Sequence, residues 1–313
     1  MTQWLLTCVE LKEEQKIYLQ DNFPTIRVVS IDLLAVSDYE KVTIIYGWSD
    51  KLPSLTHFPF LKWIQTLSAG VNYLPLEELA KRDIMVTTTS GIHGHQMTES
   101  VLGMLFSYTR NIRESILKQE KHEWGIVNTG TDLVDKRVLI FGTGSIAQQL
   151  AKTLQVFGCD VFGINRSGRQ VDHFTQTFNY QEGKSKLNTM DIVINLMPGT
   201  KETYHYFNDD LFSNMKDGVV FINMGRGTSV STSDLISHIK TEKIGFAALD
   251  VFEEEPLPKD SELWNLQNVL ITPHISGATD KYNDRAFTIL TDNLIKFMNH
   301  EELKNVVDLN LGY

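Results

Sequence analysis

The sequence predicts an α/β protein built from two doubly wound domains, and three observations support this fold class. The chain has 313 residues, more than one hydrophobic core usually organises. Short apolar runs alternate with helical patterns along almost the whole length, which is typical of βαβ units with parallel sheets. A glycine-rich turn, GTGSIA, stands between one such run and one such helical pattern. Turns of this kind occur at the ligand-binding edge of α/β sheets.

The first third of the chain contains five apolar runs that predict strands. They are Trp4–Val9, Ile26–Ile31, Val42–Trp48, Trp63–Leu67 and Ile84–Thr87. Helices are predicted between them at Lys12–Asp21 and Leu76–Arg82. From Met97 to Lys121, apolar residues recur at helical spacing and no proline interrupts them. One long helix is therefore expected there, able to bridge two domains.

A second series of apolar runs predicts six further strands. They are Val138–Phe141, Val161–Ile164, Ile192–Met197, Val219–Met224, Phe246–Val251 and Val269–Thr272. A last long helix is expected from Thr279 to Asn299, after a Ser-Gly turn, and we expect it to return to the first domain. The predicted domains are residues 1–97 together with 279–313, and residues 98–278.

The composition argues against several classes of protein. A formal net charge of −10 disfavours broad affinity for nucleic acid or for an anionic membrane. No window approaches the ~18 uninterrupted apolar residues that a membrane span needs. The two cysteines, Cys8 and Cys159, lack CxxC spacing, so neither a disulfide framework nor a metal site is expected. We therefore expect a cytoplasmic protein.

The turn GTGSIA predicts a dinucleotide site of the G-x-G-x-x-A type. Gly142 permits a tight turn, Gly144 lets the backbone approach a pyrophosphate, and Ala147 allows close packing of helix against strand. Backbone N–H groups at the helix start, at Ser145 and Ile146, would attract the pyrophosphate. An apolar strand before the turn and a second strand after the helix favour a dinucleotide site over a glycine-rich turn that binds no ligand.

The end of the second strand bears on the choice of dinucleotide. Asn165 stands 23 residues after Gly142, where NAD-binding proteins place an acidic residue that repels a 2′-phosphate. Asparagine removes this repulsion, and Arg166 offers a planar donor fork that suits phosphate. The sequence therefore favours NADP(H), with NAD(H) as the alternative if Arg166 and Arg169 are only solvated loop residues.

Several longer motifs resemble one family, the D-isomer-specific 2-hydroxyacid dehydrogenases. They are FINMGRGTSV, GFAALDVFEEEPLP, NVLITPHISGAT, TLSAGVNYL and TSGIHGHQMTE, and their order spans nearly the whole chain. The resemblance, to a glyoxylate/hydroxypyruvate reductase-like member, implies a Rossmann-type cofactor domain and a flavodoxin-like substrate domain. It also implies an active site in the cleft between them, a small 2-oxo acid or D-2-hydroxy acid substrate, and a homodimer.

In that family the motifs supply an Arg, a Glu and a His, which fall here on Arg226, Glu255 and His274. Hydride transfer to a ketone leaves negative charge on its oxygen, so His274 is expected to donate a proton there. Glu255 is expected to raise the pKa of His274, and Arg226 to bind the substrate carboxylate and polarise the carbonyl. Glu253 and Glu254, in the same FEEEP run, are expected to be solvated loop charges.

The resemblance also assigns further contacts to substrate and cofactor. Backbone N–H groups at Ala69 and Gly70 are expected to bind the substrate carboxylate. The predicted cofactor residues beyond the glycine-rich turn are Asn165, Arg166, Met197, Pro198, Thr203, Met224, Gly225 and Asp250. Asp250 would accept a hydrogen bond from the nicotinamide carboxamide, and its alternative role is that of a strand-end cap.

Two other functions remain open from the sequence. A nucleotide-sensing binding protein could share the fold and the trio, as the C-terminal binding protein corepressors do. A dehydrogenase of another donor, such as phosphite, could also keep the trio. His93 and His95 suggest a metal pair, but no cysteine or carboxylate cluster accompanies them, so structural roles are expected. The family resemblance leaves a role in shaping the substrate site as the alternative.

Overall fold

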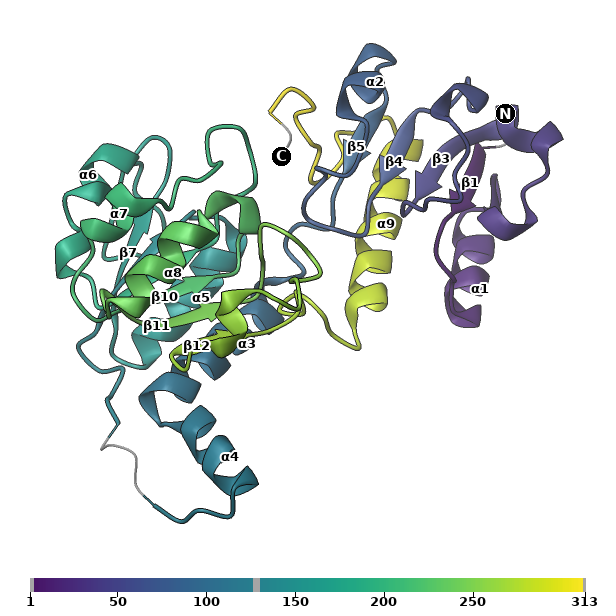
Figure 1. Ribbon diagram of the computed structural model, residues 1–313. Coiled ribbons are helices and arrows are strands. Elements are labelled where there is room, and N and C mark those ends of the chain that lie inside the picture. The colour runs from purple at the N-terminus through teal and green to yellow at the C-terminus, as the bar shows by residue number, and fades with distance from the viewer. Residues whose placement is uncertain (1–2, 126–129, 312–313) are drawn as a thin grey trace. The chain divides into compact units, whose positions relative to one another are not determined.

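The computed structural model describes residues 3–125 and 130–311 and divides into two compact units (Figure 1). One unit comprises Met1–Ile92 with Thr279–Tyr313, and the other comprises His93–Ala278. Within the described residues, the first unit carries a five-stranded sheet and the second a seven-stranded sheet, and every strand pairing is parallel. The predicted α/β class is therefore confirmed.

The first unit orders its strands β2-β1-β3-β4-β5, which is the flavodoxin-like order. Its strands are β1 (Gln3–Thr7), β2 (Ile26–Ser30), β3 (Val42–Tyr46), β4 (Trp63–Gln65) and β5 (Met85–Thr87). Its α-helices are α1 (Glu13–Asn22), α2 (Leu76–Lys81) and α9 (Tyr282–Met298), and its 3-10 turns are Ile31–Leu33, Val36–Lys41 and Leu55–His57. Leu5 faces α1 and α9, whereas its neighbour Leu6 faces the side of α2, because successive strand side chains point to opposite faces.

A buried polar cluster ties α9 to this sheet, although some 230 residues separate them in sequence. The Asn293 amide donates to Gln65 Oε1 at 3.0 Å and to the Lys304 carbonyl at 3.1 Å, and its oxygen accepts from Lys304 N at 2.8 Å. Thr87 donates to Gln65 and accepts from the Trp63 indole, each at 2.8 Å. Because buried polar groups need partners, this network fixes the position of α9 on the sheet.

The second unit orders its strands β12-β11-β10-β9-β6-β7-β8. Its strands are β6 (Arg137–Phe141), β7 (Asp160–Ile164), β8 (Gln176–Phe178), β9 (Ile192–Asn195), β10 (Val219–Asn223), β11 (Ile244–Leu249) and β12 (Val269–Ile271). Its α-helices are α3 (Gly94–Thr109), α4 (Ile112–Glu120), α5 (Ser145–Val156), α6 (Tyr180–Lys184), α7 (Asp209–Ser213) and α8 (Thr232–Lys240), and its 3-10 turns are Leu187–Thr189, Gly227–Ser229 and Glu262–Asn265. The strand order reverses between β6 and β9, and ligands of open α/β sheets bind at such a reversal, beyond the carboxyl ends of the strands.

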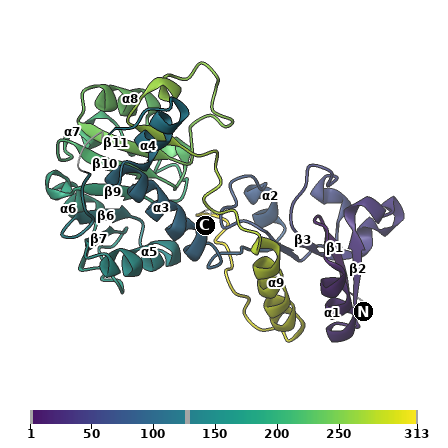
Figure 2. The ribbon, with the colours of Figure 1, turned by 90° about the horizontal axis from the view of Figure 1, so that it is seen from below.

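Both faces of the seven-stranded sheet are covered by helices. α3 and α5 lie side by side on one face (Figure 2), where Val138 and Ile140 of β6 pack against them. α7 and α8 cover the other face, where Leu139 and Phe141 point. Burial on both faces explains why the strands read as continuous apolar runs in the sequence.

Two elements differ from the sequence-based expectation. The long helix expected from Met97 to Lys121 is two helices, because Asn111 adopts a left-handed backbone with φ of 55° and ends the helical path between α3 and α4. Asparagine tolerates this conformation better than most residues. The short strand β8 was not predicted, since only two of its three residues are buried and they leave no alternating pattern.

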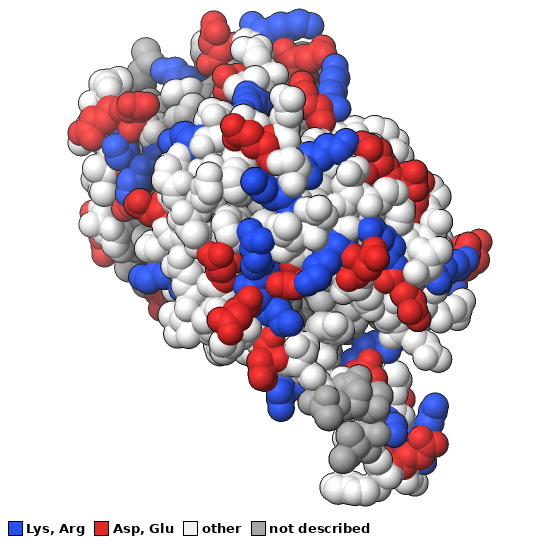
Figure 3. All heavy atoms as spheres, turned by 90° about the vertical axis from the view of Figure 1, so that its left-hand side faces the viewer, with Lys and Arg blue, Asp and Glu red and all other residues white. Residues whose placement is uncertain are grey.

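One face of the protein is mixed in charge. Over the face drawn in Figure 3, Lys and Arg side chains are interspersed with Asp and Glu rather than gathered in one patch. In the portion of the chain that the structure describes, no helix is both long and apolar enough to cross a lipid bilayer.

Candidate active site

The glycine-rich turn lies where the strand order reverses, between the end of β6 and the start of α5. Gly142 has a φ of +93°, and a Cβ there would stand 3.0 Å from the Leu196 carbonyl oxygen, so glycine is required. Around Gly144, by contrast, a Cβ would meet nothing within 4 Å. No described side chain caps α5, which leaves the first-turn N–H groups of Ser145 and Ile146 available. This open, uncapped helix start fits the pyrophosphate of a dinucleotide.

The loop after β7 is organised by the side chain of Asn165. Its amide donates to the Arg169 carbonyl at 2.9 Å and to Thr143 Oγ1 at 3.3 Å. Its oxygen accepts from the backbone N–H of Ser167 at 3.2 Å and from the Ser167 hydroxyl at 3.3 Å. Asn165 therefore shapes the loop that presents Arg166 and Ser167, and it connects this loop to the glycine-rich turn at Thr143.

Arg166 is exposed, and its charge reaches the neighbouring loop at residues 200–203. The pKa of Glu202 lies below its usual value, chiefly because Thr200 hydrogen-bonds to the carboxylate and in smaller part because Arg166 is nearby. In that loop the Thr203 hydroxyl is already engaged, since it donates to the Pro198 carbonyl and accepts from Thr200 N, both at 2.8 Å. A contact of Thr203 with the pyrophosphate stays a prediction.

Arg226 follows β10 on a tightly packed turn. A Cβ on Gly227 would fall 1.8 Å from the Phe252 carbonyl oxygen, and one on Gly225 would fall 2.7 Å from the Met197 carbonyl oxygen. Both flanking positions therefore require glycine. Burial lowers the pKa of Arg226 while the charge of nearby Glu255 acts in the opposite direction. A guanidinium stays protonated in proteins, so the turn holds a fixed positive charge.

The side chains of His274 and Glu255, which are 19 residues apart in sequence, are joined by a hydrogen bond. His274 Nδ1 lies 2.7 Å from Glu255 Oε2, and the other carboxylate oxygen accepts from Phe252 N at 2.9 Å. With Nδ1 donating to the carboxylate, Nε2 is the nitrogen left to exchange a proton with a ligand. His274 is about half exposed, so a ligand can approach the ring. The second unit thus places an imidazole and a guanidinium near one carboxylate.

The carboxylate of Asp250 organises the loop that carries His274. Asp250 is fully buried and accepts from Thr272 Oγ1 at 2.6 Å, from Ile275 N at 3.0 Å and from Ser276 N at 3.1 Å. Its carbonyl accepts from His274 N at 2.8 Å. His274 has a φ of 53°, an unfavourable backbone for a non-glycine residue, and these bonds hold it there. The contact of Asp250 with a nicotinamide carboxamide stays a prediction.

Sequence reasoning missed the role of Glu253. It is exposed, as expected of a loop charge, but it also pairs with Nε2 of His205 and accepts from Thr232 N at 2.7 Å. Burial acts to raise the pKa of Glu253, but the hydrogen bonds from Thr232 and His205 outweigh it and the pKa lies below its usual range. Glu253 therefore anchors the loop that carries Glu255 to two other segments.

In the first unit, the loop from Leu67 to Gly70 presents free backbone donors. The Leu67 carbonyl accepts from Thr89 Oγ1 at 2.5 Å and from the Tyr282 hydroxyl, and the Ser68 carbonyl accepts from Thr89 N at 3.2 Å. With the carbonyls held in this way, the N–H groups of Ser68, Ala69 and Gly70 donate to no other described residue. Such a group of N–H donors suits a carboxylate.

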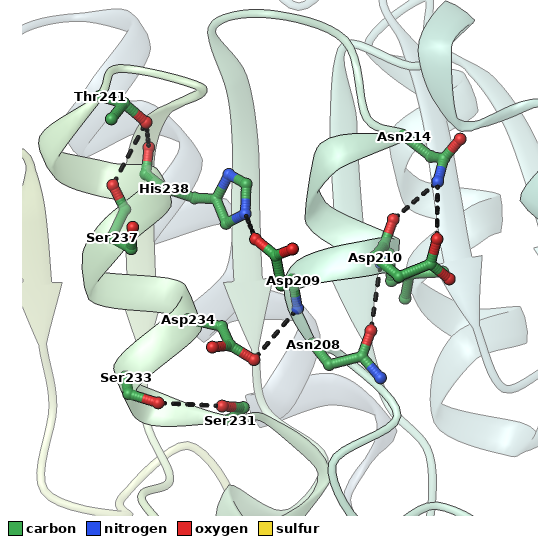
Figure 4. Close-up of polar contacts among 11 residues, drawn as sticks. Asn208, Asp209, Asp210, Asn214, Ser231, Ser233, Asp234, Ser237, His238 and Thr241 are labelled. Atoms are coloured by element: carbon green, nitrogen blue, oxygen red, sulfur yellow. Dashed lines mark hydrogen bonds and ion pairs between the residues drawn. The ribbon is translucent and has the colours of Figure 1, made fainter.

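Two further histidines of the second unit have structural surroundings. His93 is buried, and burial together with the charge of Arg226 lowers its pKa. His238 lies 2.9 Å from Asp209, whose backbone N–H donates to Asp234, so that α7 and α8 are joined (Figure 4). Among residues 3–125 and 130–311, no group of three or more His, Cys, Asp or Glu side chains could hold a metal ion.

Known proteins with similar sequences and structures match nearly the whole chain. Residues 102–276 match the family described as "D-isomer specific 2-hydroxyacid dehydrogenase, NAD binding domain". A glyoxylate/hydroxypyruvate reductase B from Klebsiella pneumoniae is 30% identical over 302 residues, 93% of each chain.

Solved structures agree with this match. A D-isomer specific 2-hydroxyacid dehydrogenase family protein from Aeromonas salmonicida is 33% identical with a TM-score of 0.87, over 99% of this chain and 100% of that one. An NADPH-dependent glyoxylate/hydroxypyruvate reductase from Sinorhizobium meliloti, in complex with NADP and sulfate, is 26% identical with a TM-score of 0.83. The match covers 99% of this chain and 100% of that one.

The depressed pKa of Glu253 predicts a contribution to stability that depends on pH. Because the folded pKa lies below the ordinary value of 4.5, the contribution is present above that pH and is lost as pH falls through the folded pKa. Glu253→Gln should lower the free energy of unfolding at pH 7 by about 1 kcal/mol, a small value because solvent screens this partly exposed pair. Urea unfolding at pH 7 and pH 3.5 measures it, and the gap between the two proteins should narrow at the lower pH. Glu254→Gln, a change of an exposed neighbour, is the control; an equal loss there would contradict the assignment.

Proposed function

The chain belongs to the D-isomer specific 2-hydroxyacid dehydrogenase family, and we propose that within this NAD(P)-dependent family it is an NADPH-preferring reductase of small 2-oxo acids. The observation that carries the proposal is the hydrogen bond between His274 and Glu255 on the same sheet edge as Arg226 and the glycine-rich turn. Glyoxylate and hydroxypyruvate are the substrates to test first, since similar proteins are named for them.

In the proposed mechanism this chain's residues bind the acid and supply a proton. Arg226 pairs with the substrate carboxylate and polarises the carbonyl. His274 Nε2 gives a proton to the carbonyl oxygen as charge develops there, and Glu255 stabilises the protonated ring through Nδ1. The nicotinamide cofactor, when bound, supplies the hydride. In the first unit, the N–H groups of Ala69 and Gly70 are proposed to bind a substrate carboxylate.

The proposed cofactor site joins two segments of the second unit. Gly142, Gly144 and the start of α5 would hold the pyrophosphate, and the loop shaped by Asn165 would present Arg166 to a 2′-phosphate. An aspartate in place of Asn165 would lose the donation to the Arg169 carbonyl and would place a negative charge beside the phosphate. Homologous structures that hold NADP or NADPH support this preference.

The proposal predicts a preference for NADPH that depends on Arg166. With glyoxylate or hydroxypyruvate, kcat/KM for NADPH should exceed that for NADH by about 10–100-fold, the effect of a charge-assisted hydrogen bond to phosphate. Arg166→Ala should remove most of that advantage while NADH turnover changes little. Asn165→Asp should move the preference toward NADH.

Initial-rate assays of both cofactors with both acids make the measurement. Arg110→Ala, which removes an exposed arginine elsewhere in the unit, is the matched control and should leave the preference unchanged. Equal or better activity with NADH would show that Asn165 and Arg166 do not select the phosphate. If neither cofactor supports turnover of these or of bulkier 2-oxo acids, the reductase proposal itself is wrong.

A second prediction concerns the pH profile of the reaction. Glu255→Gln keeps an acceptor for Phe252 N but removes the negative charge 2.7 Å from His274 Nδ1, so the protonated ring loses its stabilising partner. The ratio of kcat at pH 8 to kcat at pH 6 should fall about tenfold, which corresponds to a shift of one pH unit in the profile. Glu254→Gln should keep the wild-type profile. An unchanged profile in Glu255→Gln would count against the pairing.

The homodimer expected from the family resemblance has support on α4. No residue of α4 is buried, and three large apolar side chains on it, Ile112, Ile116 and Leu117, are exposed together with Trp124 just after it. Apolar surface of this kind is usually covered by another chain. A second copy is the proposed partner, because a cyclic dimer covers the same helix on both chains.

A charge placed on this helix should therefore break the dimer. Wild-type protein should sediment as a dimer of 35.7 kDa chains, whereas Ile116→Asp should sediment as a monomer at the same concentration. Gln119→Asp adds the same charge at an exposed polar position of α4 and should stay dimeric. Circular dichroism checks that both variants are folded. A monomeric wild type, or a dimer that survives Ile116→Asp, would remove α4 as the interface.

A further inference from the structure

Two adjacent strands of the second unit end in asparagines whose side chains are buried. Asn195 closes β9 and Asn223 closes β10, and they are 0% and 1% exposed. Nearby Ser229, in the turn after Arg226, is also 1% exposed. Burying an amide without partners costs free energy, so the bonds that these side chains make decide what they do.

The Asn195 side chain uses all of its polar atoms within this group. Its amide donates to Asn223 Oδ1 at 2.9 Å and to Ser229 Oγ at 2.7 Å. Its oxygen accepts from Met197 N at 3.0 Å, which fixes the start of the loop after β9. The group therefore joins two neighbouring loops at the carboxyl edge of the sheet.

The backbone of Arg226 is the point on which the bonds of the group converge. The Arg226 carbonyl accepts from Ser229 Oγ at 2.6 Å, from Ser229 N at 3.2 Å and from the Asn223 amide at 3.4 Å. Just before it, Gly225 N donates to Asn223 Oδ1 at 3.3 Å. The backbone on both sides of the Arg226 Cα is thus held by buried side chains.

The stem of the Arg226 side chain rests on the other loop of the same group. A Cβ on Gly199 would lie 3.1 Å from Arg226 Cγ, so the stem passes close to Gly199. Gly199 lies two residues after Met197, whose N–H Asn195 holds. Asn195 therefore holds the loop against which the Arg226 side chain packs, and it supports the Arg226 backbone through Asn223 and Ser229.

We propose that Asn195, Asn223 and Ser229 are positioning residues that place the Arg226 guanidinium for the substrate carboxylate. The inference rests on the proposed function of Arg226 and adds residues that do not themselves touch the substrate. Its physical basis is that a reacting group must be held within a fraction of an ångström, so small displacements lower the rate strongly.

Ser229→Ala is the sharpest test, because it removes one hydroxyl that joins Asn195 to the Arg226 carbonyl. We expect kcat/KM for glyoxylate to fall about tenfold, with a higher KM for glyoxylate and weaker binding of oxamate, a carboxylate analogue that is not reduced. The Kd of NADPH, measured by fluorescence without substrate, should stay within about twofold of wild type. A merely structural defect would weaken both ligands.

A double-mutant cycle decides whether Ser229 acts through Arg226. In an Arg226→Ala background, adding Ser229→Ala should change kcat/KM by less than about twofold, because the group that it positions is already gone. Thr291→Ala, which removes another buried hydroxyl bonded to a carbonyl, is the control and should leave glyoxylate kinetics unchanged. Urea unfolding of every variant reports stability separately.

Each outcome has one meaning. If Ser229→Ala lowers kcat/KM by the same factor with and without Arg226, or weakens NADPH and oxamate equally, the positioning role is wrong. If wild type reduces glyoxylate but Arg226→Ala does so equally well, the proposed function of Arg226 fails, and the inference fails with it. If wild type reduces no 2-oxo acid, the proposed reductase function is overturned first.

Discussion

The second unit depends on one constraint: polar groups at the buried carboxyl ends of parallel strands must find partners inside the protein. Asn195, Asn223 and Asp250 stand at the ends of β9, β10 and β11, and all three are almost completely buried. Neighbouring strands of a parallel sheet end at the same edge, so their last residues reach the same loops. The hydrogen bonds that satisfy these side chains thereby determine where those loops run.

The loop of His274 illustrates how such bonds sustain an unfavourable backbone. A left-handed conformation in a non-glycine residue costs about 1 kcal/mol or more. The Asp250 carboxylate offsets this cost by accepting three hydrogen bonds from the loop. Glu255 holds the imidazole ring through a further hydrogen bond. Backbone and side chain are thus restrained by different carboxylates, one buried and one partly exposed.

Sequence reasoning found most of the strands and the glycine-rich turn, because strands that are buried on both faces leave continuous apolar runs. It missed the end of the helical path at Asn111, because a single left-handed residue changes no hydrophobic period. It also missed the pairing of His205 with Glu253 and of Asn195 with Ser229, which are 48 and 34 residues apart. Polar pairs between distant segments have no spacing that a single sequence can reveal. The roles of Arg226, Glu255 and His274 came from family resemblance, and the bond between His274 and Glu255 is what the structure adds to it.

The return of α9 to the first unit has a consequence for the order of folding. The second unit is continuous, His93–Ala278, so all of its strands are available once Ala278 has been synthesised. The sheet of the first unit lacks the amide of Asn293 and the segment beside β5 until residues beyond 278 follow. Domains usually fold as units during synthesis. The strands of the first unit are therefore translated before the second unit, yet their core is completed only after it, when α9 has been synthesised.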